Sequence, residues 1–236
     1  MVYFTKLMIN DLKNIARDRL LVVGCVISPI IFIILCRSII PWISKNLYPL
    51  EPFYPILYMM MAIMMPMVFG FVISFLIMDE RDENLLTVLR VMPISRTSYL
   101  AYRLFFVSLI SFIFNLFFPL LTGLIDVSIL DYLPTAILFT LFTPVIALLI
   151  NNLANNKIQA FALFKTAGSI FFLPLFAFFI ADNWKYILGV IPNFWTFMAL
   201  DKLLETGTQD YLHLGVGYMF HIALLIVLMY QFNKKY

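Results

Sequence analysis

The sequence predicts an all-α membrane protein with six transmembrane helices, and two observations lead to this fold class. Hydrophobic residues make up 63% of the 236 positions and charged residues only 12%, whereas a soluble domain is about half apolar and a quarter charged. The apolar residues gather in six runs of about the length, roughly 18 residues, that crosses a bilayer as a helix. A net charge of +3 from 16 basic and 13 acidic residues leaves no large basic face for a nucleic acid.

The six expected spans follow one another with short connections and form one transmembrane domain over 1–236. The first span contains Arg37, whereas the second has no charged residue. The fifth is the least regular, because its charge-free part begins only at Thr166. It reaches full length if Lys165 extends its ammonium group to the membrane surface. The expected spans are 20–43, 55–78, 104–125, 133–153, 158–181 and 212–232.

The distribution of Lys and Arg predicts which side of the membrane each connection faces. Twelve of the 16 basic residues lie before the first span, between the second and third, between the fourth and fifth, or after the sixth. Lys45, Lys185 and Lys202 lie on the other side. Because basic residues are enriched in cytoplasmic connections, we expect a multi-pass protein of the cell membrane with both termini in the cytoplasm.

Residues 1–19 predict a helix that lies along the cytoplasmic surface of the membrane. Apolar side chains recur at helical spacing, while Lys6, Lys13 and Arg17 occupy the rest of the circumference. This pattern is typical of an interfacial amphipathic helix, although a membrane anchor without a further role would have the same pattern. The apolar face consists of Phe4, Leu7, Met8, Leu12 and Ile15.

The cytoplasmic connection 79–98 predicts a short helix. Acidic residues stand at its start, where they interact favourably with the helix dipole, and Pro93 ends it. The helix is too short to span and too apolar for a solvated loop, so its apolar face must dock on another surface. That surface is the lipid, the protein's own helices or a cytoplasmic partner. The apolar face comprises Leu85, Val88, Leu89 and Met92.

The segment 182–209 is rich in apolar residues but is interrupted at Pro192 and Asn193. We interpret it as a broken hydrophobic hairpin on the extracellular side that cannot cross the membrane and either dips into the outer leaflet or caps the bundle. Pro192, Phe194 and Trp195 are candidates for an extracellular gate. The alternative is an aromatic belt, which Trp184 and Trp195 also suit.

Arg37 is the candidate for a functional charge inside the membrane, because it is the only basic residue well inside a span. Near the outer end of its span, however, a long side chain can reach the headgroups, and we favour this structural interpretation. The methionines of the second span could line a path for apolar cargo, but we favour lipid contact for them.

Other polar residues in the spans do not predict a metal or catalytic site. His213 and His221 lie more than two helical turns apart, and no acid accompanies His221 in its span, so we expect no metal site. Asn115, Asn151 and Asn152 are more typical of hydrogen bonds between helices than of cargo contacts.

The connection between the second and third spans resembles the corresponding loop of type-2 ABC exporter permeases. In that family it commonly reads Glu-x-x-x-Gly-Thr-Leu-Glu-x-Leu-x-x-x-Pro-hydrophobic-Ser-Arg. This chain departs from the pattern at Asn84, Leu85 and Thr87. The amphipathic N-terminal helix, six spans and broken hairpin extend the resemblance over the whole chain. It looks most similar to short drug exporters, including the fluoroquinolone-export group. The matching residues are Glu80, Leu86, Leu89, Pro93, Ile94, Ser95 and Arg96.

The resemblance implies a permease that moves a hydrophobic or amphiphilic cargo out of the cell by alternating access. It implies a second permease chain, identical or homologous, and two cytoplasmic ATPase subunits that hold ATP and Mg²⁺. This chain has no phosphate-binding loop, and we expect no cofactor and no catalytic residue in it. The stretch 152–163, with Lys157, would make a second, weaker contact to the ATPase. Glu80, Glu83 and Arg90 would orient the short helix as charges on the rim of the contact. The implied coupling residues are Glu80, Glu83, Leu85, Leu86, Val88, Leu89, Arg90, Met92, Pro93 and Arg96.

Two alternatives remain open from the sequence. The substrate-binding membrane subunit of an energy-coupling-factor importer also has six spans and a separate ATPase. Such a subunit binds a small vitamin through a cluster of polar residues, and the sequence shows no obvious cluster of this kind. An intramembrane enzyme needs a nucleophile with a base, or a metal cluster, and two isolated histidines without paired acids argue against it.

Overall fold

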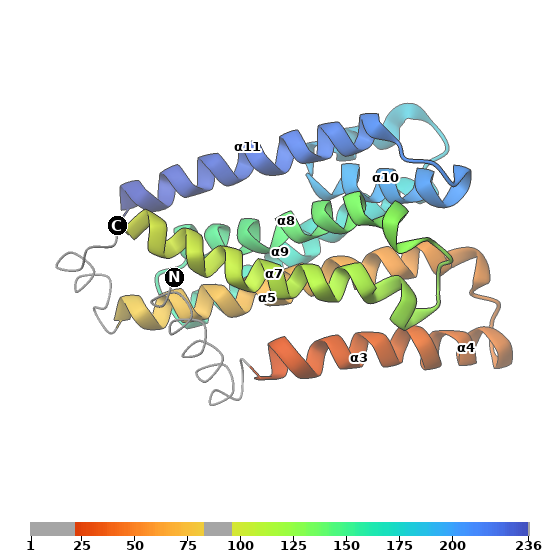
Figure 1. The fold of residues 1–236 in the computed structure, drawn as a ribbon, viewed down its shortest axis with the longest axis horizontal. Coiled ribbons are helices and arrows are strands. Elements are labelled where there is room, and N and C mark those ends of the chain that lie inside the picture. Colours follow the sequence, from red (N-terminus) through yellow and green to blue (C-terminus); the bar gives the residue numbers. More distant parts are fainter. Residues whose placement is uncertain (1–21, 83–95, 236) are drawn as a thin grey trace.

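The computed structural model describes residues 22–82 and 96–235, and these residues form a bundle of helices (Figure 1). Among them, six helical stretches are long and apolar enough to cross a membrane, as predicted. The expected interfacial helix 1–19 lies outside the described residues. The six stretches are Val23–Asn46, Glu51–Asp82, Thr97–Thr122, Ile129–Leu153, Lys157–Phe179 and Tyr211–Lys235.

The first stretch alternates between π-helical turns and α-helix because it contains two prolines. Pro29 and Pro41 each stand at the start of a short α-helix that follows a π-helical turn. Proline has no N–H to donate to the preceding turn, and the wider π-turn accommodates the missing hydrogen bond. Figure 1 shows the stretch along one side of the bundle. In order, its parts are the π-turn Val23–Ile27, α3 (Ser28–Ile34), the π-turn Leu35–Ile39 and α4 (Ile40–Asn46).

The centre of the bundle is α5 (Tyr54–Asp82), which packs against both α7 (Arg96–Thr122) and α8 (Ile129–Leu153). It is apolar around its whole circumference, as expected of a helix surrounded by neighbours. The interpretation of its methionines as lipid contacts is therefore wrong for Met59 and Met65, whereas Met60, Met61 and Met64 are half-buried. The flexible thioether side chains fill the interior of the bundle, as Met59 and Met65 illustrate, both 0% exposed.

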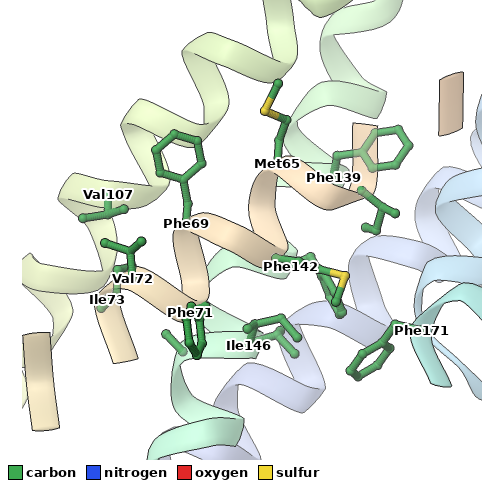
Figure 2. Packing of buried hydrophobic residues seen from close by; sticks show 14 of the residues in the cluster. Met65, Phe69, Phe71, Val72, Ile73, Val107, Phe139, Phe142, Ile146 and Phe171 are labelled. Carbon is green, nitrogen blue, oxygen red and sulfur yellow. The ribbon is translucent and has the colours of Figure 1, made fainter. Parts of the chain in front are cut away.

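Gly70 brings α5 and α8 close together. A Cβ atom at this position would lie 2.5 Å from the Thr143 carbonyl oxygen and 2.8 Å from Ile146 Cβ. Figure 2 shows the adjacent Phe69 and Phe71 on opposite sides of α5, each packed among buried side chains. The absence of a side chain at Gly70 thus sets the distance between α5 and α8, the two spans in which the largest share of residues is buried.

The fifth stretch changes its helix type partway along. It begins as α9 (Lys157–Phe172) and continues as the 3₁₀ helix Leu173–Phe179. Pro174 lies at the start of the 3₁₀ helix, where its missing N–H interrupts α-helical hydrogen bonding. The expected span 158–181 corresponds to this stretch.

The segment after the fifth stretch turns back on itself before the last helix. A 3₁₀ helix, Asn183–Val190, is followed by a break at Ile191 and then by α10 (Asn193–Thr206). Gly207 ends α10 in the left-handed conformation, with φ of 69°, which glycine adopts without steric cost. The chain then enters α11 (Tyr211–Lys235).

α10 is packed into the bundle rather than exposed beside it. The Phe197 ring lies 6.1 Å from the ring of Phe139 on α8, measured between centroids. Ala199 clusters with Leu138 of α8 and Leu214 of α11. Figure 1 shows α10 alongside α11, over the part of the bundle where α8 begins. The sequence pattern of this segment therefore reflects burial against α8 and α11.

Candidate functional site

Three consecutive residues at the end of α5 connect this helix to three different segments. The carboxylate of Asp79 forms an ion pair with Lys157, the first residue of α9. Glu80 pairs with Arg103 of α7. The Arg81 guanidinium donates a hydrogen bond of 2.6 Å to the carbonyl oxygen of Asn155, in the connection between α8 and α9. We call Asp79, Glu80 and Arg81 the α5 clamp.

The Glu80 contact is the buried part of the clamp. Glu80 is 7% exposed and Arg103 is 6% exposed. The Tyr99 hydroxyl donates to Glu80 Oε1 at 2.6 Å and accepts from Nε and Nη2 of Arg103 at 3.1 and 2.9 Å. The Arg103 guanidinium also lies over the Tyr99 ring, 5.4 Å from its centroid. Breaking a buried, hydrogen-bonded ion pair strands an uncompensated charge, so these side chains hold α5 and α7 together at this end.

The two residues of this ion pair flank the predicted coupling connection in the sequence. Glu80 precedes residues 83–95 in the chain and Arg103 follows them, so the pair joins the two helices between which those residues run. Most of the predicted coupling residues lie outside the described residues, and of Arg96 only its place at the start of α7 is described. Those outside are Glu83, Leu85, Leu86, Val88, Leu89, Arg90, Met92 and Pro93, together with the interfacial Phe4, Leu7, Met8, Leu12 and Ile15.

The placement of Glu80 differs from the expectation. A charge on the rim of a partner contact is solvent-exposed, whereas the Glu80 carboxylate is buried between α5 and α7. The reason is that Arg103 and Tyr99 face it from α7. The sequence does contain a signal for this, because Tyr99 and Arg103 are four positions apart and share one helix face. An acid and a base just inside the ends of consecutive spans indicate a pair between them.

The connection between α8 and α9 is itself well ordered by local hydrogen bonds. Asn156 caps α9, because its Oδ1 accepts from the backbone N–H of Gln159 at 2.9 Å. Gln159 Oε1 in turn accepts from the backbone N–H of Asn155 at 2.9 Å. The first bond satisfies an amide in the first turn of α9, and the second satisfies the amide of the residue just before the cap. The carbonyl of Asn155 is thereby fixed as the acceptor for Arg81.

α11 is tied to the same end of the bundle. Lys235 donates from Nζ to the carbonyl oxygen of Asn152 at 2.9 Å, where a cation also interacts favourably with the C-terminal end of the α8 dipole. Asn152 Nδ2 donates to the Leu228 carbonyl oxygen at 2.9 Å. The predicted interhelical role of Asn152 is confirmed by this bond. The stretch 152–163, expected as a second partner contact, thus lies against both the α5 clamp and α11.

The remaining candidates lie elsewhere. Arg37 is exposed, and its Nη1 donates to the Leu121 carbonyl oxygen at 3.1 Å, which joins the first stretch to the end of α7. Pro192 stands directly before α10, and Phe194 is fully buried. Trp195 Nε1 donates to the Gly189 carbonyl oxygen at 2.8 Å. The proposed gate residues therefore hold the 3₁₀ helix Asn183–Val190 against α10.

Comparison with known proteins places the chain in a transporter family. Residues 11–229 match the family described as "Fluoroquinolones export permease protein Rv2686c-like". The fluoroquinolones export permease proteins MT2760 and Rv2686c, from two strains of Mycobacterium tuberculosis, are each 29% identical over 235 residues. The alignment covers 96% of this chain and 92% of each relative. No solved structure matches the chain. With six helices that can cross a membrane and a family match over nearly its whole length, the chain belongs to the Rv2686c-like fluoroquinolone export permease family.

Proposed function

We propose that this chain is the transmembrane subunit of an ATP-driven ABC exporter. The complex contains two permease chains, identical or homologous, and two cytoplasmic ATPase subunits that bind ATP and Mg²⁺. The chain contributes the membrane path and a docking helix within 79–98, and both of its termini are cytoplasmic. The ATPase subunits supply the free energy.

The α5 clamp is the observation that carries this proposal. A partner that moves the connection after Asp82 pulls directly on the end of α5. The Glu80 to Arg103 pair passes that displacement to α7, because separating a buried ion pair is costly. Asp79 and Arg81 pass it to the start of α9 and to the connection before it. One docked helix can therefore shift several spans together.

The cargo follows from the relatives and from the character of the bundle. The relatives are named as exporters of fluoroquinolones, which are planar, amphiphilic aromatic molecules. The interior of the bundle contains many aromatic side chains, such as the stacked pair Phe71 and Phe164, with ring centroids 4.4 Å apart. Cargo of this class moves between the two permease chains, open by turns to each side of the membrane.

The deciding experiment is purification of the tagged chain from its native membrane in nanodiscs, followed by native mass spectrometry and a transport assay. We expect two ATPase subunits with two permease chains, and ATP-dependent movement of a fluoroquinolone in proteoliposomes. An assembly without any ATPase, even after crosslinking, would overturn the proposal. Binding of a vitamin by the isolated chain at high affinity would instead support an importer.

A further inference from the structure

One face of α9 carries polar side chains that are exposed on the outside of the bundle. These residues recur at positions i, i+3, i+4 and i+7, so they share one side of the helix. The opposite side packs on α5, where Phe164 stacks on Phe71 and Ala167 is buried. We call the exposed set the α9 stripe, and it consists of Ala162, Lys165, Thr166 and Ser169.

The α9 stripe differs from the exposed faces of the other outer spans. The exposed faces of α7 and α11 are apolar between their ends, as lipid contact requires. The first stretch exposes Arg37 and Ser38, but the Arg37 guanidinium is bonded to the Leu121 carbonyl oxygen. The Lys165 ammonium forms no ion pair or hydrogen bond with any described residue and lies over the Phe161 ring, 5.1 Å from its centroid.

The α9 stripe extends to a depth that lipid headgroups do not reach. α9 begins at Lys157, so Lys165 lies about 12 Å and Ser169 about 18 Å along the helix. Half of the hydrocarbon core is about 15 Å thick. A lysine side chain can extend back to the headgroups, whereas the short Ser169 side chain stays near the middle of the bilayer. A lipid headgroup therefore matches only the Lys165 end of the stripe.

A dry contact with an identical chain would not satisfy the α9 stripe either. The 13 acidic residues of the chain lie at the ends of the six spanning stretches or outside them. A second copy thus offers no carboxylate at the depth of Lys165, and burying a cation without a counter-charge is costly. Ionisable residues at membrane depth almost always face the bundle interior or a water-filled cavity. An exposed Lys165 therefore fits the wall of a path between two chains.

The hydroxyl groups of the stripe are acceptors toward the outside. Thr166 Oγ1 donates to the Ala162 carbonyl oxygen at 3.0 Å. Ser169 Oγ donates to the Lys165 carbonyl oxygen at 3.3 Å. Because each hydroxyl hydrogen is engaged within the helix, only the oxygen lone pairs remain for a ligand, whereas the ammonium group is purely a donor. The stripe thus complements a molecule with an anionic group and a separate N–H donor.

We propose that the α9 stripe is a cargo-binding site on the wall of the path between the two permease chains. It selects an amphiphilic molecule that carries a carboxylate and a separate N–H donor. Lys165 pairs with the carboxylate, and the hydroxyl oxygens of Thr166 and Ser169 accept from the N–H group. This site rests on the proposed export function, because the second chain of that complex encloses the stripe.

The α5 clamp connects this site to the proposed docking segment. Lys157, at the start of α9, forms an ion pair with Asp79. Two turns further along, the Phe161 ring lies beneath the Lys165 ammonium and contacts the Phe71 ring of α5, at 6.0 Å between centroids. A displacement of the end of α5 therefore moves α9 and the stripe with it.

The test compares two probes on the permease assembly purified from its native membrane into phosphatidylcholine nanodiscs. One probe is a fluoroquinolone carboxylic acid, and the other is its methyl ester, which keeps the rings and the amine. Binding is followed by the fluorescence of the probes, after subtraction of binding to empty nanodiscs. We expect the wild-type assembly to bind the acid about tenfold more tightly, because hydrogen bonds to charged groups are strong. In Lys165→Met we expect the two probes to bind equally.

Three further variants keep the result interpretable. Lys165→Arg retains a cation and should keep the preference for the acid. Lys234→Met removes a lysine from the last turn of α11 and should leave the preference unchanged. Ser169→Ala should weaken both probes alike, by about fivefold, because the amine is common to both.

Three outcomes would overturn the site. The first is an acid preference in Lys165→Met that equals that of the wild type. The second is equal binding of both probes to the wild type, together with phosphatidylglycerol that native mass spectrometry finds retained only when Lys165 is present. The third is loss of the second permease chain from the Lys165→Met assembly, which would make Lys165 a contact between chains. ATPase co-purification judges the export function separately, so failure of the site and failure of that function can be told apart.

Discussion

The carboxylate of Glu80 and the guanidinium of Arg103 form a buried ion pair across the interface of α5 and α7. Because the residues that connect these helices lie between the two partners in the chain, the pair brings both ends of the connection together. The pair therefore has two roles. It holds two spans together, and it fixes the helices from which the segment proposed to dock on the ATPase extends.

Removing either partner of the pair should be costly, because the other charge then stays buried without compensation. Glu80→Gln leaves the Arg103 charge buried without its acid, and we expect a loss of about 3–5 kcal/mol in unfolding free energy. Arg103→Gln should cost a similar amount. The double variant should cost clearly less than the sum of the two, because the residues interact directly. Unfolding of the detergent-solubilised chain in a denaturant series measures this coupling, and additive effects would contradict the pair.

The ion pair of Asp79 and Lys157 provides a matched comparison at the same end of α5. Its side chains are 37% and 43% exposed, and exposed pairs contribute about 0–1 kcal/mol. Asp79→Asn should therefore change the unfolding free energy only slightly, and the small effect should vanish at high salt. If Asp79→Asn lowered the unfolding free energy as much as Glu80→Gln does, burial would not be what separates the contributions of these two ion pairs.

The arrangement of the spans could be predicted from the sequence because lipid imposes a simple requirement. Backbone groups in the bilayer must be paired within a helix, so apolar length alone indicates a span such as Ile129–Leu153. Hydropathy does not distinguish protein contact from lipid contact, because both favour the same residues. For this reason Met59 and Met65 could not be assigned to the interior until the neighbours of α5 were known.

The candidate site could be predicted only in part, for a different reason. The end of α5 stands out in the sequence because charges follow an uncharged span. The partners of those charges come from α7 and α9, and pairing across helices depends on rotation and depth rather than on local pattern.

The docking face proposed within 79–98 should be sensitive to a charge. Leu89→Asp places a carboxylate on that face, and desolvating it against a partner is costly. We expect loss of ATPase co-purification from nanodiscs with normal membrane insertion. Leu89→Met keeps an apolar side chain of similar volume and should retain the ATPase. Unchanged co-purification of the Asp variant would refute the docking face.

The pH dependence of stability should depend on Asp201 of α10. Partial burial raises the pKa of this carboxyl above its usual range, and the nearby Glu205 raises it further, against the opposing effect of Lys202 and Lys185. The folded state then binds a proton more tightly than the unfolded state, so the group costs stability as pH rises through the raised pKa. Asp201→Asn should raise Tm at neutral pH and lose this advantage in acid below the ordinary carboxyl pKa. A Tm difference that is the same at every pH would contradict this assignment.

Gly70 offers the sharpest test of the packing at the centre of the bundle. In Gly70→Ala the new Cβ would lie 2.5 Å from a backbone oxygen, that of Thr143, and 2.8 Å from Ile146 Cβ. Backbone atoms cannot rotate away as a side-chain end can, so α5 and α8 must separate. Overpacking of this kind costs about 1–3 kcal/mol. The matched control is Gly215→Ala in α11, where a Cβ atom would meet nothing within 4 Å. There the substitution should stabilise the chain by about 0.5–1 kcal/mol through helix propensity. Thermal unfolding of both variants in nanodiscs should therefore shift Tm in opposite directions, and a stabilised Gly70→Ala would show that the two central spans are not in the close contact described above.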